Sequence, residues 1–520
     1  MAGGVLAIGP QQRAGAIAAA LLAALVLGTL AAVAIHAGGL SGLGPWDGRA
    51  IRFTLWQAAL SATLSAGLAV PVARALARRD FPGRAVLVTL LGAPFILPVI
   101  VAIMGLISVF GRNGALNEGL RALGLPEIGI YGWQGVILAH VFFNLPLSVR
   151  LILQGWQAIP AERFRLAESL GFAPGDIARH LERPMLRAVL PGVWLAVFLV
   201  CLTSFAVALT LGGGPRATTV ELAIYQAFRF DFDMGRAATL GLVQVGLCLA
   251  AMALAARVTM PSGFGAGMDA RVRFRGPGGW RRWGDGLAIL LAAGFLIWPM
   301  ATVTAEGLPR IPALEATVWA AAGRSVVMAL VSALLTLVLG LVLAQAIARG
   351  VPRWPTRLIE AAGMLPLVAS PLVLGTGLFL ILRPWIGPGQ MALPVTVAIN
   401  AAMALPFALR ALIPAARALQ EDYGRLAASL DLRGFAALRH LVLPRLARPL
   451  GFAGGLAAAL AMGDLGVIAL FAGDRPTLPL KLYQLMEAYR IADASACAVL
   501  LMAISFALFW IFDRGGRLDA

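Results

Sequence analysis

The sequence predicts an all-α membrane protein with about twelve transmembrane helices, arranged as two tandem six-helix repeats. Hydrophobic residues make up 60% of the 520 residues, charged residues only 13%, and the mean hydropathy is +0.85. Such a chain has too little polar surface to cover a soluble globule of this length. Apolar runs of about 20 residues, long enough to cross a hydrocarbon core as helices, recur along the whole chain. A polar segment is also repeated half a chain apart.

The apolar runs define the expected membrane helices in order. In the first half they cover approximately 14–38, 50–77, 85–109, 132–156, 189–211 and 236–257. In the second half they cover approximately 284–305, 319–348, 358–383, 392–415, 449–472 and 490–513. The first run is too long for a signal-peptide core and lacks a small-residue cleavage site, so we expect it to remain a membrane helix. A Gly- and Arg-rich linker at 258–283 then separates a first half, 1–257, from a second half, 284–520.

One polar, Arg-rich segment occurs twice in this otherwise apolar chain. Arg165-Leu-Ala-Glu-Ser-Leu-Gly171 recurs as Arg425-Leu-Ala-Ala-Ser-Leu-Asp431, at an offset of 260 (425 − 165). The gapless match pairs Ala167 with Ala427, His180 with His440 and Pro184 with Pro444. A single basic loop is commonly a contact with membrane lipid. Two gapless copies favour a contact surface for a partner, repeated at about 160–184 and 420–444.

Each copy is expected to contain two short helical segments separated by a break. Gly171 supplies the break in the first copy, because glycine accepts a positive φ without a Cβ penalty. Asp431 stands at this position in the second copy, and aspartate visits that region more readily than most residues. Pro184 and Pro444 are expected to end the local pattern before the next membrane span.

The net charge of +17 is distributed over alternate loops. Arginines gather between the second and third spans, between the fourth and fifth spans, and in the linker, whereas the intervening loops mix both signs. Positively charged loops stay on the cytoplasmic side of a membrane. The pattern therefore predicts that both termini and both repeated loops are cytoplasmic, and it excludes nucleic acid as the reason for the basic charge.

The sequence contains no recognisable catalytic machinery or cofactor site. Cys201, Cys248 and Cys497 lie in apolar runs without metal or redox spacing, and the four histidines form no ligand pair. No phosphate-binding loop, HExxH or nucleophile elbow is present. A secondary transporter would need intramembrane acids or bases for ion coupling. Only Asp464 qualifies, and its counterpart in the first half (464 − 260 = 204) is Ser204.

The candidate pathway residues lie inside the membrane spans, at the outer end of the fifth span, and in the outer loops that follow the fifth and eleventh spans. Gly212-Gly213-Gly214-Pro215 cannot continue a helix. The following Val220–Phe228 is apolar on one side, with Glu221 and Arg229 at its edges, which predicts either a short interfacial helix at the mouth of a pathway or a helix that only caps the bundle. The candidates for a pathway or gate are Asn144, Ser204, Gly214, Tyr225, Asp464 and Tyr483.

Asp464 has two alternative roles. Gly463 and Gly466 flank it, which favours a broken stretch of helix where the carboxylate accepts backbone N–H groups and serves structure or gating. The alternative is a counter-ion for a cationic substrate. In either case a charged group inside a membrane helix faces a cavity or a polar partner rather than lipid.

The two repeated loops resemble the EAA loop of ABC importer permeases, whose short helices insert into a groove on ATPase subunits. The usual form has Glu-Ala-Ala, three residues, Gly, and then an Ile-x-Leu-Pro ending. This chain has Arg165 and Arg425 at the Glu position, Ala167 and Ala427 at the last Ala, Gly171 and Asp431 at the Gly, and the endings Leu181-Glu-Arg-Pro184 and Leu441-Val-Leu-Pro444. It departs from the pattern at the Glu position in both copies and at Asp431.

The fused arrangement of two permease halves is similar to a subset of these importers, chiefly those for thiamine and for ferric iron. Longer stretches at 135–146, 211–226 and 463–471 resemble permeases for thiamine and thiamine diphosphate. The resemblance implies a type I ABC importer permease fold in a bacterial inner membrane, working by ATP-driven alternating access. It also implies two copies of an ATPase subunit, which use ATP and Mg, and one periplasmic substrate-binding protein. This chain itself would be non-catalytic and bind no cofactor.

Overall fold

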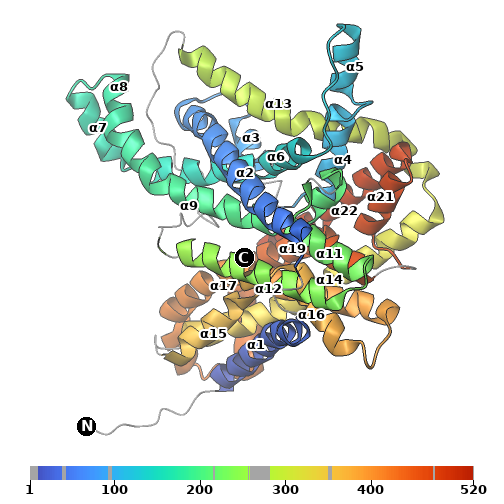
Figure 1. Ribbon diagram of the computed structural model, residues 1–520. Helices are drawn as coiled ribbons and strands as arrows, with labels where there is room; N and C mark the ends of the chain where they lie inside the picture. The colour runs from blue at the N-terminus through green and yellow to red at the C-terminus, as the bar shows by residue number, and fades with distance from the viewer. Residues whose placement is uncertain are drawn as a thin grey trace.

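Figure 1 shows the computed structural model of the protein, which describes residues 10–37, 43–91, 96–214, 217–255, 257, 281–349, 354–471 and 475–518. In these ranges every regular element is helical. Eleven of the described helices are long and apolar enough to cross a membrane, or twelve if one sharply bent pair counts as a span. The prediction of an all-α protein with about twelve membrane helices is confirmed.

The helices follow the expected order along the chain. The first half contains α1 (Pro10–His36), α2 (Pro45–Arg78), α3 (Arg84–Leu90), α4 (Val99–Phe110), α5 (Ala115–Ala122), α6 (Trp133–Gln157), α7 (Ala161–Ser169), α8 (Pro174–Ile177), the π-helical turn η3 (Ala178–Glu182), α9 (Arg183–Leu202), α10 (Ala206–Leu211), α11 (Val220–Arg229) and α12 (Met234–Ala255). The second half contains α13 (Arg281–Gly307), η5 (Leu308–Ala313), α14 (Ala316–Arg349), α15 (Trp354–Met364), η6 (Leu365–Val368), α16 (Pro371–Leu382), α17 (Pro388–Ser429), α18 (Gly434–Ala437), the π-helical turn η7 (Leu438–Val442), α19 (Leu443–Met462), α20 (Gly466–Phe471), α21 (Leu478–Glu487) and α22 (Ile491–Leu518).

The first helix of each half packs against the other half. α1 lies against α14 and α16, and α13 lies against α2 and α4. A glycine permits the close crossing in both places. A Cβ atom on Gly377 of α16 would lie 2.4 Å from the carbonyl oxygen of Thr29, and one on Gly105 of α4 would lie 2.7 Å from that of Pro299. Each glycine is the seventh residue of its helix, since α4 begins at Val99 and α16 at Pro371. The two glycines are therefore equivalent, and both halves repeat this packing of a first helix against the other half.

The long helices α2 and α14 hold equivalent short helices at one end of the bundle. The backbone N–H of Val220, at the start of α11, donates to Thr54 Oγ1 at 2.9 Å. The backbone N–H of Leu478, at the start of α21, donates to Ser325 Oγ at 2.7 Å. Each bond satisfies a helix N-terminal donor that has no partner within its own helix. We call this end of the bundle the outer end, and the opposite end, where residues 160–184 and 420–444 project, the inner end.

The third span of each half is not the continuous helix that the apolar pattern predicts. In the second half η6 ends α15, and Ser370 caps a new helix, α16, which is turned by 97° from the preceding one. In the first half α4 begins directly after Pro98. Proline lacks a backbone donor and disfavours helix at the residue before it, so a new helix begins at Pro371 and after Pro98.

Part of the predicted domain division falls outside the described residues. This applies to 258–280, which includes most of the expected linker, and to Pro215 and Arg216. α13 begins at Arg281, three residues before the expected start of the second half at 284. The boundaries at 257 and 284 stay predictions.

The close crossing of α1 and α16 gives a prediction with a matched control. Gly377→Ala should destabilise the protein by about 1–3 kcal/mol, because its Cβ meets backbone atoms of Thr29 that cannot rotate away. Gly28→Ala, one residue from Thr29 on the other helix of the crossing, meets no atom within 4 Å and should leave stability unchanged or raised. Thermal unfolding in detergent measures both. Equal midpoints for the two variants would contradict the crossing.

Candidate functional site

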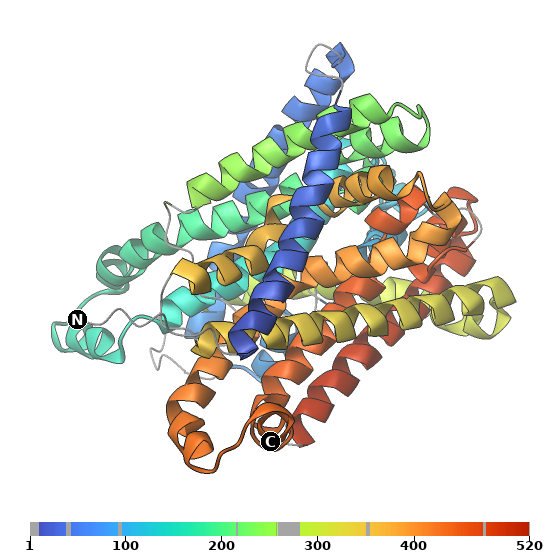
Figure 2. The same cartoon turned by 90° about the horizontal axis from the view of Figure 1, so that it is seen from below.

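The two repeated loops project from the same end of the helix bundle (Figure 2). The first consists of α7, α8 and η3 and leads into α9. The second consists of the last turns of α17 followed by α18 and η7, and leads into α19. The predicted helical segments on either side of a break are present in both copies, and in the second copy the first segment is the end of the long helix α17.

The break has the same backbone geometry in the two loops. Gly171 has a φ of 67° and Asp431 a φ of 48°. The N–H of Phe172 donates to the carbonyl of Ala167 at 2.9 Å, and the N–H of Leu432 donates to that of Ala427 at 2.9 Å. These bonds, which span five residues, satisfy a free carbonyl at the helix end when the intervening residue is left-handed. The repeat therefore preserves a helix C-cap, which Asp431 adopts despite its Cβ.

The expectation that Pro184 and Pro444 end the local pattern is wrong. In both copies the helix continues through the proline into the next membrane span, after a five-residue π-helical turn at Ala178–Glu182 or Leu438–Val442. A proline ring clashes with the carbonyl four residues earlier in an α-helix. A π-turn, whose hydrogen bonds reach five residues back, relieves that clash.

The helix before the break differs between the copies. In the first copy α6 ends at Gln157 and α7 begins after Pro160. In the second copy Gln420 stands at the position of Pro160 (420 − 160 = 260), and α17 continues without interruption to Ser429. Glutamine supplies the backbone N–H that proline lacks, which favours a continuous helix at this position, although α17 contains three prolines elsewhere.

Each loop exposes the same pair of large apolar side chains. Leu166 and Leu170 are 59% and 62% exposed, and their counterparts Leu426 and Leu430 are 53% and 62% exposed. Arg165 and Arg425 precede these pairs and are exposed, as are His180 and His440. The leucines lie four residues apart and therefore on one helix face. Sequence analysis overlooked these leucine pairs, although the offset of 260 contains them. We call them the leucine pairs.

A buried ion pair fastens the first loop to α2. Glu182, whose side chain is 4% exposed, is bound by Arg78 and by Arg74, with the Arg74 Nη2–Glu182 Oε2 distance at 3.0 Å. The second half has Val442 in place of Glu182 and Gln345 in place of Arg74, so it cannot form this ion pair. Sequence analysis missed it because the partners are about a hundred residues apart.

Asp464 and Ser204 lie in equivalent breaks between membrane helices. α9 ends at Leu202 and α10 begins at Ala206, whereas α19 ends at Met462 and α20 begins at Gly466. Asp464 Oδ1 accepts the backbone N–H of Gly466 at 3.2 Å. The expected broken helix, with the carboxylate accepting backbone donors, is therefore present.

The two breaks lie at the interface between the halves. A Cβ atom on Gly466 would lie 3.6 Å from the ring of Phe205, which belongs to the break of the first half. A Cβ atom on Gly463 would lie 3.2 Å from Cα of Pro98, also in the first half. The interface is therefore irregular backbone on both sides, and irregular backbone at membrane depth is found where protein or a water-filled pathway surrounds it.

The remaining pathway candidates occupy different environments. Tyr225 is 7% exposed and its ring centroid lies 5.2 Å from that of Phe205, close to the interface of the breaks. Tyr483 is half-buried at the equivalent place on α21. Gly214 is exposed with a φ of 114°. Asn144 is 2% exposed and donates to the carbonyl of His140 at 2.8 Å, inside the first half rather than between the halves.

The short helix α11 forms as predicted, and its burial favours the alternative of a helix that caps the bundle. Six of its apolar side chains and Glu221 are buried. Glu221 is 0% exposed and was expected at the edge of an apolar face, whereas Arg229 at the end of the helix is exposed. The helix packs against α2, α12 and α16, so neighbouring helices cover the face that the amphipathic pattern assigns to solvent.

Metal-ligating side chains do not cluster in the part of the chain that the structure describes. None of the described residues forms a group of three or more His, Cys, Asp or Glu side chains able to hold a metal ion. All three cysteines are free and buried. The described polar residues are instead arranged as helix caps, ion pairs and helix breaks.

Comparison with known proteins gives a consistent set of relatives. A Brucella abortus protein, "Thiamine transport system permease protein ThiP", is 40% identical over 514 residues, which cover 96% of this chain and 94% of the relative. Proteins of the same name from Salmonella typhimurium and Escherichia coli are 40% and 39% identical, each over 89% of this chain and 88% of the relative. No protein-family model matches the chain.

The left-handed C-cap of the first loop gives a second prediction. Gly171→Val should strain the turn by about 1–2 kcal/mol, because a Cβ-branched side chain disfavours a positive φ. The loop should then open more often, and trypsin should cleave at its arginines faster. Gly175→Val, in the same loop but without a positive φ and with no atom within 4 Å, is the control. Equal cleavage rates in the two variants would rule out the strained cap.

Proposed function

Since the chain belongs to the family of thiamine transport system permease proteins, we propose that it carries thiamine or its phosphates across the inner membrane into the cytoplasm. It is the permease subunit of a binding-protein-dependent ABC importer. The chain supplies the pathway and the moving helices. Separate ATPase subunits, using ATP and Mg, hydrolyse the nucleotide.

The inner end of the bundle faces the cytoplasm in this proposal. The support is the distribution of arginine, which is concentrated in the loops between α2 and α3 and between α6 and α9, and in the linker. Both repeated loops and both termini are then cytoplasmic. The outer end, with α11 and α21, faces the periplasm and receives substrate from one binding protein.

The leucine pairs are the observation from which we infer that the partner is an ATPase subunit. Each is an exposed apolar face on the helix that precedes the break at the inner end, and the two occur at the same place in the repeat. An amphipathic helix that presents apolar residues at i and i+4 binds in an apolar groove of a partner. Two equivalent faces on one chain match two copies of one ATPase subunit, so the particle contains one copy of this chain.

The geometry of the breaks supports alternating access. ATP can drive transport only if its binding favours one conformation of the permease over another. Closure of the two ATPase subunits would push the two loops together and rock the halves about their interface. The breaks at 203–205 and 463–465 lie at that interface, where the pathway for the substrate would open.

A duplicated secondary transporter is the alternative from a different class. It needs ion-coupling acids or bases in the membrane on its pathway. At the interface of the breaks Asp464 has Ser204 as its counterpart, so the repeat contains one carboxylate rather than a relay. The relatives that cover 96% of this chain are transport system permeases, which favours the ABC importer.

The leucine pairs give the test of the assembly. Replacing Leu166 and Leu170 by serine should reduce co-purification of the ATPase at least about tenfold, since truncating apolar anchors of this kind costs about 2 kcal/mol or more. Leu123→Ser, at a leucine of the outer end that is 75% exposed, is the control. Native mass spectrometry of the unchanged complex should show one copy of this chain with two ATPase subunits. Two copies of this chain per particle would contradict the proposal.

Asp464 gives the test of the pathway. Asp464→Asn keeps the shape of the side chain and its acceptor for the backbone N–H of Gly466, so most thiamine uptake should remain. Asp464→Leu removes the acceptor and leaves helix donors unsatisfied, so uptake should be lost. Loss of uptake in Asp464→Asn, with normal insertion and ATPase binding, would instead assign the carboxylate as counter-ion for the cationic substrate.

A further inference from the structure

Two aromatic residues at the outer end have an unusual backbone conformation. Among the described residues, the non-glycine positions with a positive φ are Phe232 (54°), Asp431 (48°) and Tyr489 (57°). Asp431 belongs to the inner loop, whereas Phe232 and Tyr489 lie in the α11–α12 and α21–α22 loops. Each stands two residues before the next helix, which begins at Met234 or Ile491. The two halves therefore repeat the feature.

The rings of these residues project from the protein. Phe232 is 74% exposed and Tyr489 is 88% exposed. A positive φ is unfavourable for a bulky side chain. At Tyr489 it closes the C-cap of α21, where the N–H of Arg490 donates to the carbonyl of Leu485 at 3.0 Å. Aromatic side chains in a membrane-interface belt need no such backbone. Trp385, 74% exposed in the α16–α17 loop, is an exposed aromatic residue without a positive φ.

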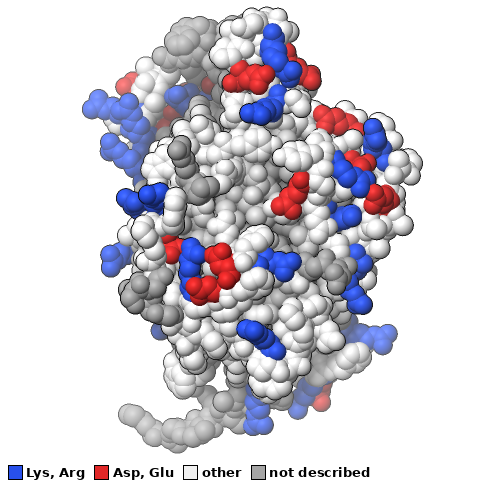
Figure 3. All heavy atoms as spheres, turned by 45° about the vertical axis from the view of Figure 1, so that its right-hand side comes forward, with Lys and Arg blue, Asp and Glu red and all other residues white. Residues whose placement is uncertain are grey.

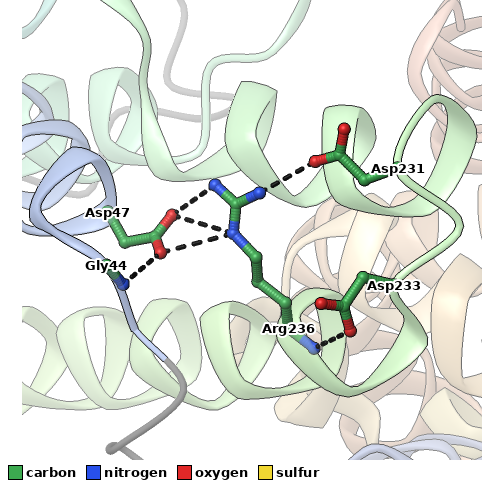
Figure 4. Close-up of polar contacts among 5 residues, drawn as sticks. All are labelled: Gly44, Asp47, Asp231, Asp233 and Arg236. Carbon is green, nitrogen blue, oxygen red and sulfur yellow. Dashed lines mark hydrogen bonds and ion pairs between the residues drawn. The ribbon is translucent and has the colours of Figure 1, made fainter.

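An ion network holds the first loop in place (Figure 4). Arg236 Nη2 lies 2.7 Å from Asp47 Oδ1, and Nη1 lies 2.8 Å from Asp231 Oδ2. The backbone N–H of Arg236 donates to Asp233 Oδ1 at 2.9 Å. Asp47, in the first turn of α2, is 2% exposed and also accepts the N–H of Gly44 at 2.9 Å. The loop that carries Phe232 is thus anchored to the outer start of α2.

A second network holds the other loop in the same manner. Arg490 lies 2.7 Å from Glu315, which directly precedes α14, and 2.7 Å from Asp493 in the first turn of α22. Hydrogen bonds to Asp493 and Glu315 raise the pKa of Arg490 above its usual value. In each half one arginine binds two carboxylates, one of them at the start of the long helix. The formal charges sum to −2 in the first network, where three aspartates surround Arg236, and to −1 in the second, where Glu315 and Asp493 bind Arg490.

The surroundings of the rings define what they can bind. Figure 3 brings forward the outer side of the molecule, where charged side chains of both signs lie in small groups on a largely uncharged surface. A rigidly held, exposed aromatic ring can insert into an apolar hollow on a partner protein. The acidic group beside the ring favours Lys or Arg at the edge of that hollow. Because the rings belong to different halves, one partner that contacts both must span the outer end from the α11–α12 loop to the α21–α22 loop, over the mouth of the proposed pathway.

We propose that Phe232 and Tyr489 are paired docking contacts for the periplasmic substrate-binding protein, which covers the mouth by inserting one ring into each of two apolar hollows edged by basic residues. This inference rests on the proposed function and names the contact of its partner. The networks of Arg236 and Arg490 hold the rings in position, so docking costs little ordering of the loops. They also connect each ring to the start of α2 or α14.

The test uses the full complex of this chain with its ATPase in nanodiscs and titrates substrate-loaded binding protein against ATPase activity. The double variant Phe232→Asn, Tyr489→Asn removes both rings, and asparagine accepts a positive φ, so the loops stay folded. We expect the binding-protein concentration for half-maximal stimulation to rise at least about tenfold. Basal ATPase activity and the thermal unfolding midpoint should not change. Phe232→Tyr and Tyr489→Phe should behave as the unchanged chain.

Trp385→Asn is the matched control. In this variant the binding-protein concentration for half-maximal stimulation of ATPase activity should not change. Unchanged half-maximal stimulation in the double Asn variant would overturn the inference while leaving the proposed function intact. An equal loss in Trp385→Asn would also overturn it, because any exposed aromatic ring would then serve. Reduced insertion into the membrane without weaker binding would assign the rings to lipid. An unchanged complex that the binding protein does not stimulate would overturn the proposed function itself.

Discussion

Helix α2 is held at both of its ends by arginine–carboxylate ion pairs. Its 34 residues span about 51 Å at 1.5 Å per residue. At the outer end Asp47 binds Arg236, and at the inner end Glu182 binds Arg78 and Arg74. Both carboxylates are at most 4% exposed, and a buried charge that loses its partner is strongly destabilising. The outer loop of Phe232 and the first inner loop are therefore both attached to α2.

The second half repeats only the outer part of this arrangement. Arg490 and Glu315 connect the outer loop to the start of α14, but Val442 and Gln345 stand where Glu182 and Arg74 form the inner ion pair of the first half. The second inner loop is instead continuous with the 42-residue helix α17. Ion pairs thus connect the first inner loop to α2, whereas a continuous helical backbone connects the second inner loop to α17. Both arrangements tie an inner loop to a membrane helix, as the proposed function requires.

The sequence predicted the features that depend on local chemistry. The left-handed caps at Gly171 and Asp431 and the broken helix at Asp464 follow from residue types within a few positions of each other. Features that depend on distant partners could not be predicted. The exchange of α1 and α13 between the halves leaves no periodic signal in helices that are apolar on every side. Prolines gave no reliable guide either, since Pro71 and Pro146 lie inside continuous helices whereas α4 starts after Pro98. The ion pair of Arg78 with Glu182 joins residues 104 positions apart.

The most direct test of the account is uptake of labelled thiamine into proteoliposomes that contain this chain and its ATPase. The binding protein is supplied outside, and ATP, a proton gradient or a sodium gradient is imposed in separate experiments. The account predicts uptake only with ATP inside the vesicles and binding protein outside, because the energy enters through the inner loops. Uptake that an ion gradient drives without ATP and binding protein would contradict the assignment as an ABC importer permease.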